Sequence, residues 1–173
     1  MGKPLLNYAF IDGQNFFTSV GYILEKLEAL EVEFDFSEFR TYLKEKHGVD
    51  VARYFIGYVS NNAGLYRRFR RQGYSLVFKE VATTEDGIKG NVDVNLTLQT
   101  MIDLGNFEKA VIVTSDGDYA CLTDHLYSLG KLECLIACSR GGCSYLLRKR
   151  QNKVRIYYLD DIIRDLHTRR ETS

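Results

Sequence analysis

The sequence has a single proline among 173 residues, and it has no long run of glycine and serine and no repeat at a fixed period. Linkers between domains are rich in such residues, so their scarcity argues against two separated units. Hydrophobic residues make up 45% of the chain, which is enough apolar material for a sizeable core and argues against disorder. We therefore expect one folded domain over residues 1–173.

The sequence also lacks a long apolar run. No stretch approaches the roughly 20 residues that span a bilayer, and residues 1–12 carry no signal-peptide pattern. We therefore expect a cytoplasmic protein with no membrane contact and with reduced cysteines. We expect Cys121 and Cys134 in the core, and Cys138 and Cys143, in a loop rich in serine and glycine, closer to the surface. Their spacing matches no zinc finger or ribbon, and no pair of histidines completes such a site.

Neither sign of charge is in excess, because 23 Lys and Arg residues balance 23 Asp and Glu residues. A strongly basic chain would point directly to nucleic-acid binding, so any such contact must come from a local patch. One segment combines four arginines with two aromatic residues: Arg67, Arg68, Arg70 and Arg71, with Tyr66 and Phe69. Arginine binds phosphates and aromatic rings stack on unpaired bases, so this segment is a candidate RNA-binding surface. The alternative is a solvated helix face with both aromatic residues in the core, and residues 148–155 form a second basic stretch of that kind.

Hydrophobic periodicity and turn residues predict alternating strands and helices. We expect strands over Leu5–Ile11, Asp50–Ser60, Tyr74–Val81, Lys109–Thr114, Leu132–Ala137 and Val154–Tyr158. We expect helices over Asn15–Leu30, Ser37–His47, Asn62–Gln72, Asn91 or Asp93 to Gly105, Tyr119–Leu129, Tyr145–Arg150 and Leu159–His167. The fourth helix is predicted by four apolar residues that share one face: Val94, Leu98, Met101 and Ile102. This alternation predicts an α/β fold with three α/β/α layers around a central, mostly parallel sheet of five or six strands.

Four aspartates fall where such a sheet binds ligands, at the carboxyl ends of its strands. Asp12 follows the first strand, Asp116 and Asp118 follow the Lys109–Thr114 strand, and Asp93 opens the helix before that strand. If the first strand and the Lys109–Thr114 strand are neighbours, the carboxylates converge at one edge. Each aspartate alone also fits a turn or a helix N-cap. Their joint placement favours one acidic site.

Carboxylates gathered in one place repel one another unless a cation neutralises them. Mg²⁺ or Mn²⁺ fits this role because both favour oxygen ligands, and no His or Cys lies in these segments to favour zinc. A metal ion there would polarise a phosphate, lower the pKa of an attacking water and stabilise the leaving oxygen. One metal ion and two metal ions are equally compatible with the sequence.

Several polar residues near the aspartates are candidates for supporting roles. Asn15 fits either a contact with phosphate or metal-bound water, or an N-cap. Thr114 and Ser115 fit either hydroxyl ligands or an ST-turn. Lys89 fits either a phosphate contact or an ordinary exposed lysine in a loop.

Three motifs resemble the NYN domain family, a PIN-like ribonuclease family that includes the LabA-like proteins. They are Phe10-Ile11-Asp12-Gly13-Gln14-Asn15, Lys89-Gly90-Asn91-Val92-Asp93-Val94 and Val113-Thr114-Ser115-Asp116-Gly117-Asp118-Tyr119. The resemblance runs in order over roughly residues 5–160. It implies a PIN-like, Rossmann-like fold and a metal-dependent endoribonuclease that hydrolyses phosphodiester bonds of RNA.

The same resemblance implies roles for individual residues. Asp12, Asp93 and Asp116 match the central acidic positions, with Asn15 and Asp118 in supporting positions. Members often carry a further acidic residue in the helix after the Lys89–Val94 motif. The nearest candidates here are Gln99 and Asp103.

Other classes of protein fit the motifs less well. A dinucleotide oxidoreductase needs a G-x-G-x-x-G turn, which the segment Asp12–Asn15 lacks. A phosphotransferase with an aspartyl nucleophile would resemble the haloacid dehalogenase pattern Asp-x-Asp, but position 14 is Gln. The main alternative is a non-catalytic RNA-binding or protein-interaction module of the same fold.

The expected partner is single-stranded RNA, with DNA as an alternative. Exposed aromatic residues would suit a homodimer interface.

Overall fold

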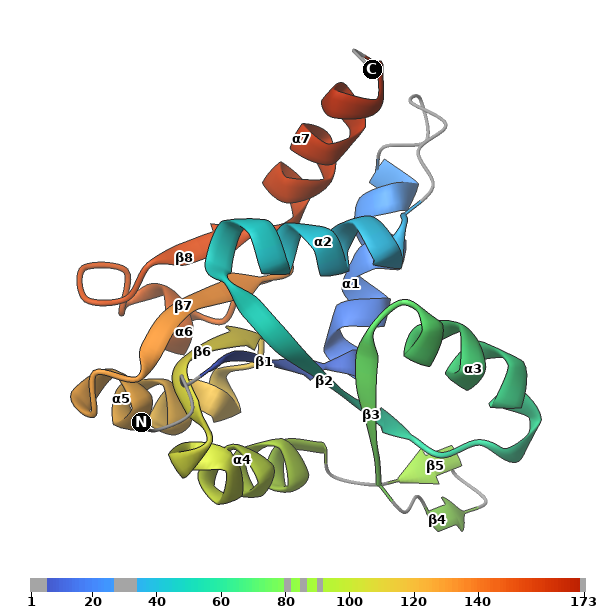
Figure 1. The fold of residues 1–173 in the computed structure, drawn as a ribbon, viewed down its shortest axis with the longest axis horizontal. Coiled ribbons are helices and arrows are strands. Elements are labelled where there is room, and N and C mark those ends of the chain that lie inside the picture. Colours follow the sequence, from blue (N-terminus) through green and yellow to red (C-terminus); the bar gives the residue numbers. More distant parts are fainter. Residues whose placement is uncertain (1–5, 27–33, 80–81, 85–86, 90–91, 172–173) are drawn as a thin grey trace, which may run out of the picture.

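The computed structural model describes residues 6–26, 34–79, 82–84, 87–89 and 92–171, with the backbone alone for residues 26, 82–84, 87–89, 92–93 and 167–171. Within these residues six parallel strands form one sheet in the order β3-β2-β1-β6-β7-β8 (Figure 1). The strands are β1 (Leu6–Asp12), β2 (Val49–Gly57), β3 (Tyr74–Lys79), β6 (Phe107–Val113), β7 (Leu132–Ala137) and β8 (Ile156–Tyr158). The first three of these strands along the chain, β1, β2 and β3, form one half of the sheet, and β6, β7 and β8 form the other half, so β1 and β6 are neighbours at its centre. The strand order therefore reverses between β1 and β6, where doubly wound sheets bind ligands.

Helices cover both faces of the sheet, which confirms the expected three layers (Figure 1). One face carries α1 (Gly13–Lys26), α2 (Phe36–His47), α3 (Ala63–Arg71) and α7 (Leu159–Glu171). The other face carries α4 (Val92–Ile102), α5 (Ala120–Ser128) and α6 (Tyr145–Arg148). Short 3₁₀ turns precede or follow these helices: η2 (Ser60–Asn62), η3 (Asp103–Gly105) and η4 (Gly117–Tyr119). In the part of the chain that the structure describes, no helix combines the length and the apolar character needed to cross a membrane.

Each layer of helices has its own hydrophobic core against the sheet. In α1, Phe16, Val20 and Ile23 recur at helical spacing and are all buried on the face that α2 and α3 share. Tyr66 and Phe69 of α3 are also buried, so the aromatic residues of the arginine-rich segment serve the core. The predicted elements are therefore present, with boundaries displaced by a few residues, and residues 27–30 of the first predicted helix lie outside the described part.

The sequence pattern did not predict the antiparallel hairpin of β4 (Ala82–Thr84) and β5 (Gly87–Lys89) between β3 and α4. Each strand has three residues, which is too short for alternation to be recognised. The hairpin is separate from the main sheet.

Helix α4 is present as predicted, but the four apolar residues that predicted it do not face the core. Val94, Leu98, Met101 and Ile102 are exposed, whereas Leu96 and Thr100 are fully buried. The orientation of α4 is explained by an ion pair just after the helix. Asp103, the first residue of η3, pairs with Arg53 of β2 through Nε and Oδ2 at 2.5 Å, and α4 is turned so that Asp103 faces the sheet.

The expected burial of the cysteines is also wrong for three of the four. Cys121 is exposed on α5, and Cys138 and Cys143 are buried. Cys121 lies between the buried residues Ala120 and Leu122 but points outward. Cys138 directly follows β7 and contacts Asn15 in the first turn of α1. Cys134 is buried in β7, as expected.

Gly13 begins α1 where the helix approaches β2 too closely for a side chain. A Cβ atom at this position would lie 2.3 Å from the carbonyl oxygen of Phe55 and 2.4 Å from the ring of Tyr54. The first turn of α1 is thereby held directly against the carboxyl end of β2.

We expect Gly13→Ala to lower the free energy of unfolding by about 1–3 kcal/mol, because backbone must move to admit the methyl group. Gly21→Ala in the same helix is the matched control, since a Cβ there meets no atom within 4 Å. That control should raise stability by up to about 1 kcal/mol through helix propensity. Urea unfolding of both variants measures the difference, and equal effects would contradict the packing described for Gly13.

Candidate active site

The two central strands bring Asp12 and Thr114 together at one edge of the sheet. Ile11 of β1 pairs with Val113 of β6, so the next residue of each strand leaves the sheet at the same edge. The Thr114 hydroxyl donates to Oδ2 of Asp12 at 3.1 Å. Both side chains are buried, with 4% of Asp12 and none of Thr114 exposed.

The other carboxylate oxygen of Asp12 caps helix α1. Oδ1 accepts a hydrogen bond from the backbone N–H of Asn15 at 3.2 Å. The cap is therefore supplied by Asp12, and the alternative that Asn15 is the N-cap is wrong. The positive end of the helix dipole faces the carboxylate and stabilises its negative charge. Burial raises the pKa of the neighbouring Tyr54 and the Asp12 charge raises it further, so that phenol stays protonated and donates to the carbonyl of Gly13.

Asn15 joins three elements through its side-chain oxygen. Oδ1 accepts from the backbone N–H of Ser115 at 2.8 Å and lies 3.0 Å from Sγ of Cys138. Burial raises the pKa of the Cys138 thiol, so the thiol is protonated and serves as the donor. The Ser115 hydroxyl in turn accepts from the backbone N–H of Cys138 at 2.7 Å. Helix α1 and the ends of β6 and β7 are thus held in one hydrogen-bonded unit.

Asp116 is connected to Asp12 through Thr114. The Thr114 hydroxyl accepts from the backbone N–H of Asp116 at 3.1 Å, which is the ST-turn considered for this residue. Oδ1 of Asp116 accepts from the backbone N–H of Asp118 at 3.0 Å and so caps η4. The alternative that Asp118 is the cap is wrong, and its side chain is exposed.

Asp93 and Lys89 have side chains outside the described part of the structure. The backbone of residue 93 lies in the first turn of α4, and this helix contacts β1, β2 and η4. Position 93 precedes the buried Leu96 by three residues in the same helix. The proposed contribution of Asp93 to the site remains a prediction.

The two candidates for a further acidic position are engaged elsewhere. Asp103 binds Arg53 with both oxygens, and Gln99 Nε2 donates to Asp103 Oδ2 at 3.2 Å. Arg53 aligns with Phe10, two residues before Asp12, so this pair lies away from the carboxyl edge. Both candidates therefore hold α4 to the sheet.

The four arginines predicted to contact substrate, Arg67, Arg68, Arg70 and Arg71, are all exposed on α3. Helix α3 and the preceding η2 follow β2, so this segment starts at the edge of the sheet that carries Asp12. Within the described residues no hydrogen bond or ion pair joins these arginines to the aspartates. The basic helix therefore begins at the edge that carries Asp12 and runs back toward the amino end of β3.

The donor set at the edge fits a hard divalent cation. Asp12, Asp116 and the Thr114 hydroxyl offer oxygen atoms, and Asp116 and Asp118 form no ion pair with a described residue. Among the described side chains no three His, Cys, Asp or Glu residues are grouped to hold a metal ion, and Asp93 is not one of those side chains.

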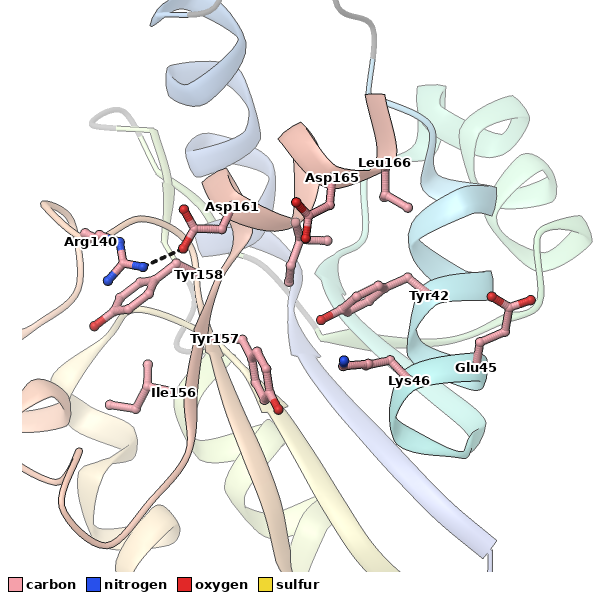
Figure 2. A pocket seen from close by; sticks show the side chains of 11 residues that line it. Tyr42, Glu45, Lys46, Arg140, Ile156, Tyr157, Tyr158, Asp161, Asp165 and Leu166 are labelled. Carbon is pink, nitrogen blue, oxygen red and sulfur yellow. Dashed lines mark hydrogen bonds and ion pairs between the residues drawn. The ribbon is translucent and has the colours of Figure 1, made fainter. Parts of the chain in front are cut away.

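A pocket of about 440 Å³ lies elsewhere, between α2, β8 and α7 (Figure 2). Tyr42 and Tyr157 stand on opposite walls, and the Arg140–Asp161 ion pair closes one side. None of the predicted site residues lines this pocket. It is therefore separate from the acidic edge.

Sequence reasoning missed the part that Cys138 plays beneath Asn15. The available signal was its position, because Cys138 directly follows β7 just as Thr114 directly follows β6. The same rule that located the aspartates therefore also locates this thiol.

The fold and the polar edge define a doubly wound α/β protein with a candidate ligand site where the strand order reverses. The NYN domain model matches residues 8–159, so the chain belongs to the NYN domain family, which generally has a PIN-like nuclease fold and usually uses divalent metals. A crystal structure of a protein of unknown function from Vibrio parahaemolyticus is similar, with a TM-score of 0.70 and 18% sequence identity. The match covers 93% of this chain and 98% of that one, and at this identity it supports the fold alone. No curated protein sequence matches.

We expect Thr114→Val to lower the free energy of unfolding by about 1–3 kcal/mol, because it removes a buried hydroxyl bonded to Asp12 and Asp116. Thr100→Val is the matched control, since Thr100 is equally buried but its hydroxyl bonds only the Leu96 carbonyl within α4. The Leu96 carbonyl keeps its helical hydrogen bond in Thr100→Val, so this control should lower the free energy of unfolding by less. Equal losses in urea unfolding would show that the Thr114 hydroxyl does not hold the edge together.

Proposed function

We propose that this protein is a metal-dependent endoribonuclease that hydrolyses phosphodiester bonds of RNA at the edge formed by Asp12, Asp93 and Asp116. The observation that supports it most is the Thr114 hydroxyl, which bonds Asp12 and the backbone of Asp116 where the strand order reverses. Membership of the NYN family supports the class of reaction. The proposal takes Mg²⁺ or Mn²⁺ as the cofactor.

When bound, the divalent ion supplies the charge that polarises the phosphate and lowers the pKa of the attacking water. Asp12, Asp93 and Asp116 would hold it, and the exposed Asp118 would support them. The N–H of Asn15 and the hydroxyl of Thr114 fix the orientation of the Asp12 carboxylate before substrate arrives. A pre-oriented group needs no reorganisation during the reaction, which is a large source of catalytic rate.

Substrate binding in this proposal uses charges beside the acidic residues. Lys89 contacts a phosphate near the metal ion, and the exposed arginines of α3 bind phosphates farther along the strand. Asn15 and Ser115 lie beneath the substrate in this proposal and contact it from that side alone. Their side chains already join α1 to the ends of β6 and β7. The expected substrate is single-stranded RNA.

We expect Asp12→Asn, Asp93→Asn and Asp116→Asn each to abolish cleavage of internally labelled RNA in Mg²⁺ or Mn²⁺ while the fold is retained. Loss of a carboxylate removes a charged ligand that an amide does not replace. Asp50→Asn is the matched control, because Asp50 is exposed at the opposite end of β2. Labelled DNA run in parallel separates the two substrates, and thermal melting checks the fold.

Two outcomes of that assay would overturn the catalytic proposal. RNA binding without cleavage by the wild-type protein would favour the non-catalytic module. Unfolding of all three variants would show that the carboxylates are structural.

We expect the double variant Arg67→Ala, Arg71→Ala to bind RNA more weakly and with less dependence on salt. Each lost phosphate contact lowers the slope of log K against log salt by about 0.7 for a single strand, so two contacts lower it by about 1.4. The double variant Arg148→Ala, Lys149→Ala, in the second basic stretch, serves as the control. Fluorescence anisotropy at several salt concentrations gives the slopes, and an unchanged slope for the α3 variant would exclude this helix as the phosphate-binding surface.

A further inference from the structure

Tyr58 is an exposed aromatic residue at the same edge of the sheet as the aspartates. Its side chain is 52% exposed, and its backbone N–H donates to the Lys79 carbonyl at 3.3 Å, which extends the pairing of β2 and β3 past Gly57. Asp12 aligns with Phe55 on the neighbouring strand, so Tyr58 lies three residues farther along β2. Three residues of extended chain correspond to about 10 Å.

The ring of Tyr58 is held in place from behind. It stacks on Tyr66, with ring centres 5.9 Å apart and planes 28° apart, and it meets the edge of Phe78 at 5.4 Å. Tyr66 is itself buried, and its hydroxyl accepts from the backbone N–H of Val59 at 2.8 Å. A ring fixed in this way loses little conformational entropy when a ligand covers its free face.

Positive charge lies directly beside these rings. The guanidinium of Arg70 is 5.7 Å from the centre of the Phe78 ring, and the other arginines of α3 are exposed along the same helix. An aromatic surface next to a basic groove or stripe is the arrangement that binds single-stranded nucleic acid, with bases on the rings and phosphates on the arginines.

Two other exposed tyrosines lack these features. Tyr127 on α5 and Tyr145 on α6 belong to the opposite layer of helices and form no ring contact with a described residue. Single exposed aromatics are ordinary on protein surfaces. Tyr58 differs because a second ring supports it and a cation accompanies it.

We propose that Tyr58 is a stacking platform for one unpaired base of the RNA strand that the acidic edge cleaves. This inference rests on the proposed function, because the same strand must cover both features. Bases in a duplex have both faces covered by their neighbours, so only an unpaired base can stack on the ring. Tyr58 therefore selects single-stranded substrate.

The two features also define the path of the strand. Asp12 is the last residue of β1, and its carboxylate caps α1. Tyr58 lies just past the end of the neighbouring strand β2 and contacts Tyr66 of α3, a helix of the same layer as α1. A strand that reaches both residues therefore passes over the ends of β1 and β2.

The test uses the absence of tryptophan from the chain. Tyr58→Trp in an Asp116→Asn background gives a single tryptophan, at the platform, in a protein that does not cleave. Titration with oligo-uridine should quench its emission, whereas an abasic oligonucleotide of the same length should bind without quenching. Tyr127→Trp, an exposed tyrosine on α5, is the matched control and should show no change.

A second measurement gives the size of the effect. Tyr58→Ala should weaken binding of oligo-uridine by about 5- to 150-fold, the range found when a base–aromatic stack is removed. Tyr58→Phe should bind as the wild type does, because the ring is kept. For cleavage by the wild-type background, Tyr58→Ala should raise KM with little change in kcat.

The outcomes separate this inference from the proposed reaction. Cleavage by the wild type with no quenching at position 58, or equal quenching by the abasic strand, would overturn the platform alone. Quenching specific to position 58 without cleavage would leave the platform and overturn the hydrolytic role. Absence of RNA binding by every variant would overturn both.

Discussion

The parallel pairing of β1 with β6 is the interaction on which both the fold and the candidate site depend. It closes the two halves of the sheet and brings Asp12 beside Thr114, residues separated by 102 positions in the chain. No local segment can make this contact, because each half of the chain supplies one strand. Formation of the central sheet and formation of the acidic edge are therefore the same event, and such non-local pairing is characteristic of slowly folding topologies.

Most of the architecture could be predicted because its elements carry strong local signals. Apolar runs such as Ala110–Val113 define buried strands, and the rule that ligands bind at the carboxyl ends of parallel strands located Asp12 and Asp116. The failures have a common cause in tertiary contacts. The orientation of α4 follows the ion pair of Arg53 with Asp103, and the burial of Cys138 follows its contact with Asn15. Neither partner is near in sequence, so periodicity does not reveal them.

The polar edge combines structural and chemical roles in the same side chains. The carboxylate of Asp12 caps α1 with one oxygen and accepts from Thr114 with the other, and Asp116 caps η4. The backbone therefore orients these carboxylates as soon as the helices form. The proposed binding surface and the candidate site are carried by different elements, since the arginines and Tyr58 lie on or against α3.

The four cysteines differ in burial, so the rates at which they react with a thiol reagent report on internal motions of the folded protein. Cys121 is open to solvent, whereas Cys134, Cys138 and Cys143 are enclosed. Alkylating reagents will modify Cys121 in the native state and reach the other three only when the surrounding structure opens. Because Cys138 contacts Asn15, its alkylation rate relative to that of Cys134 distinguishes local opening of the candidate site from global unfolding.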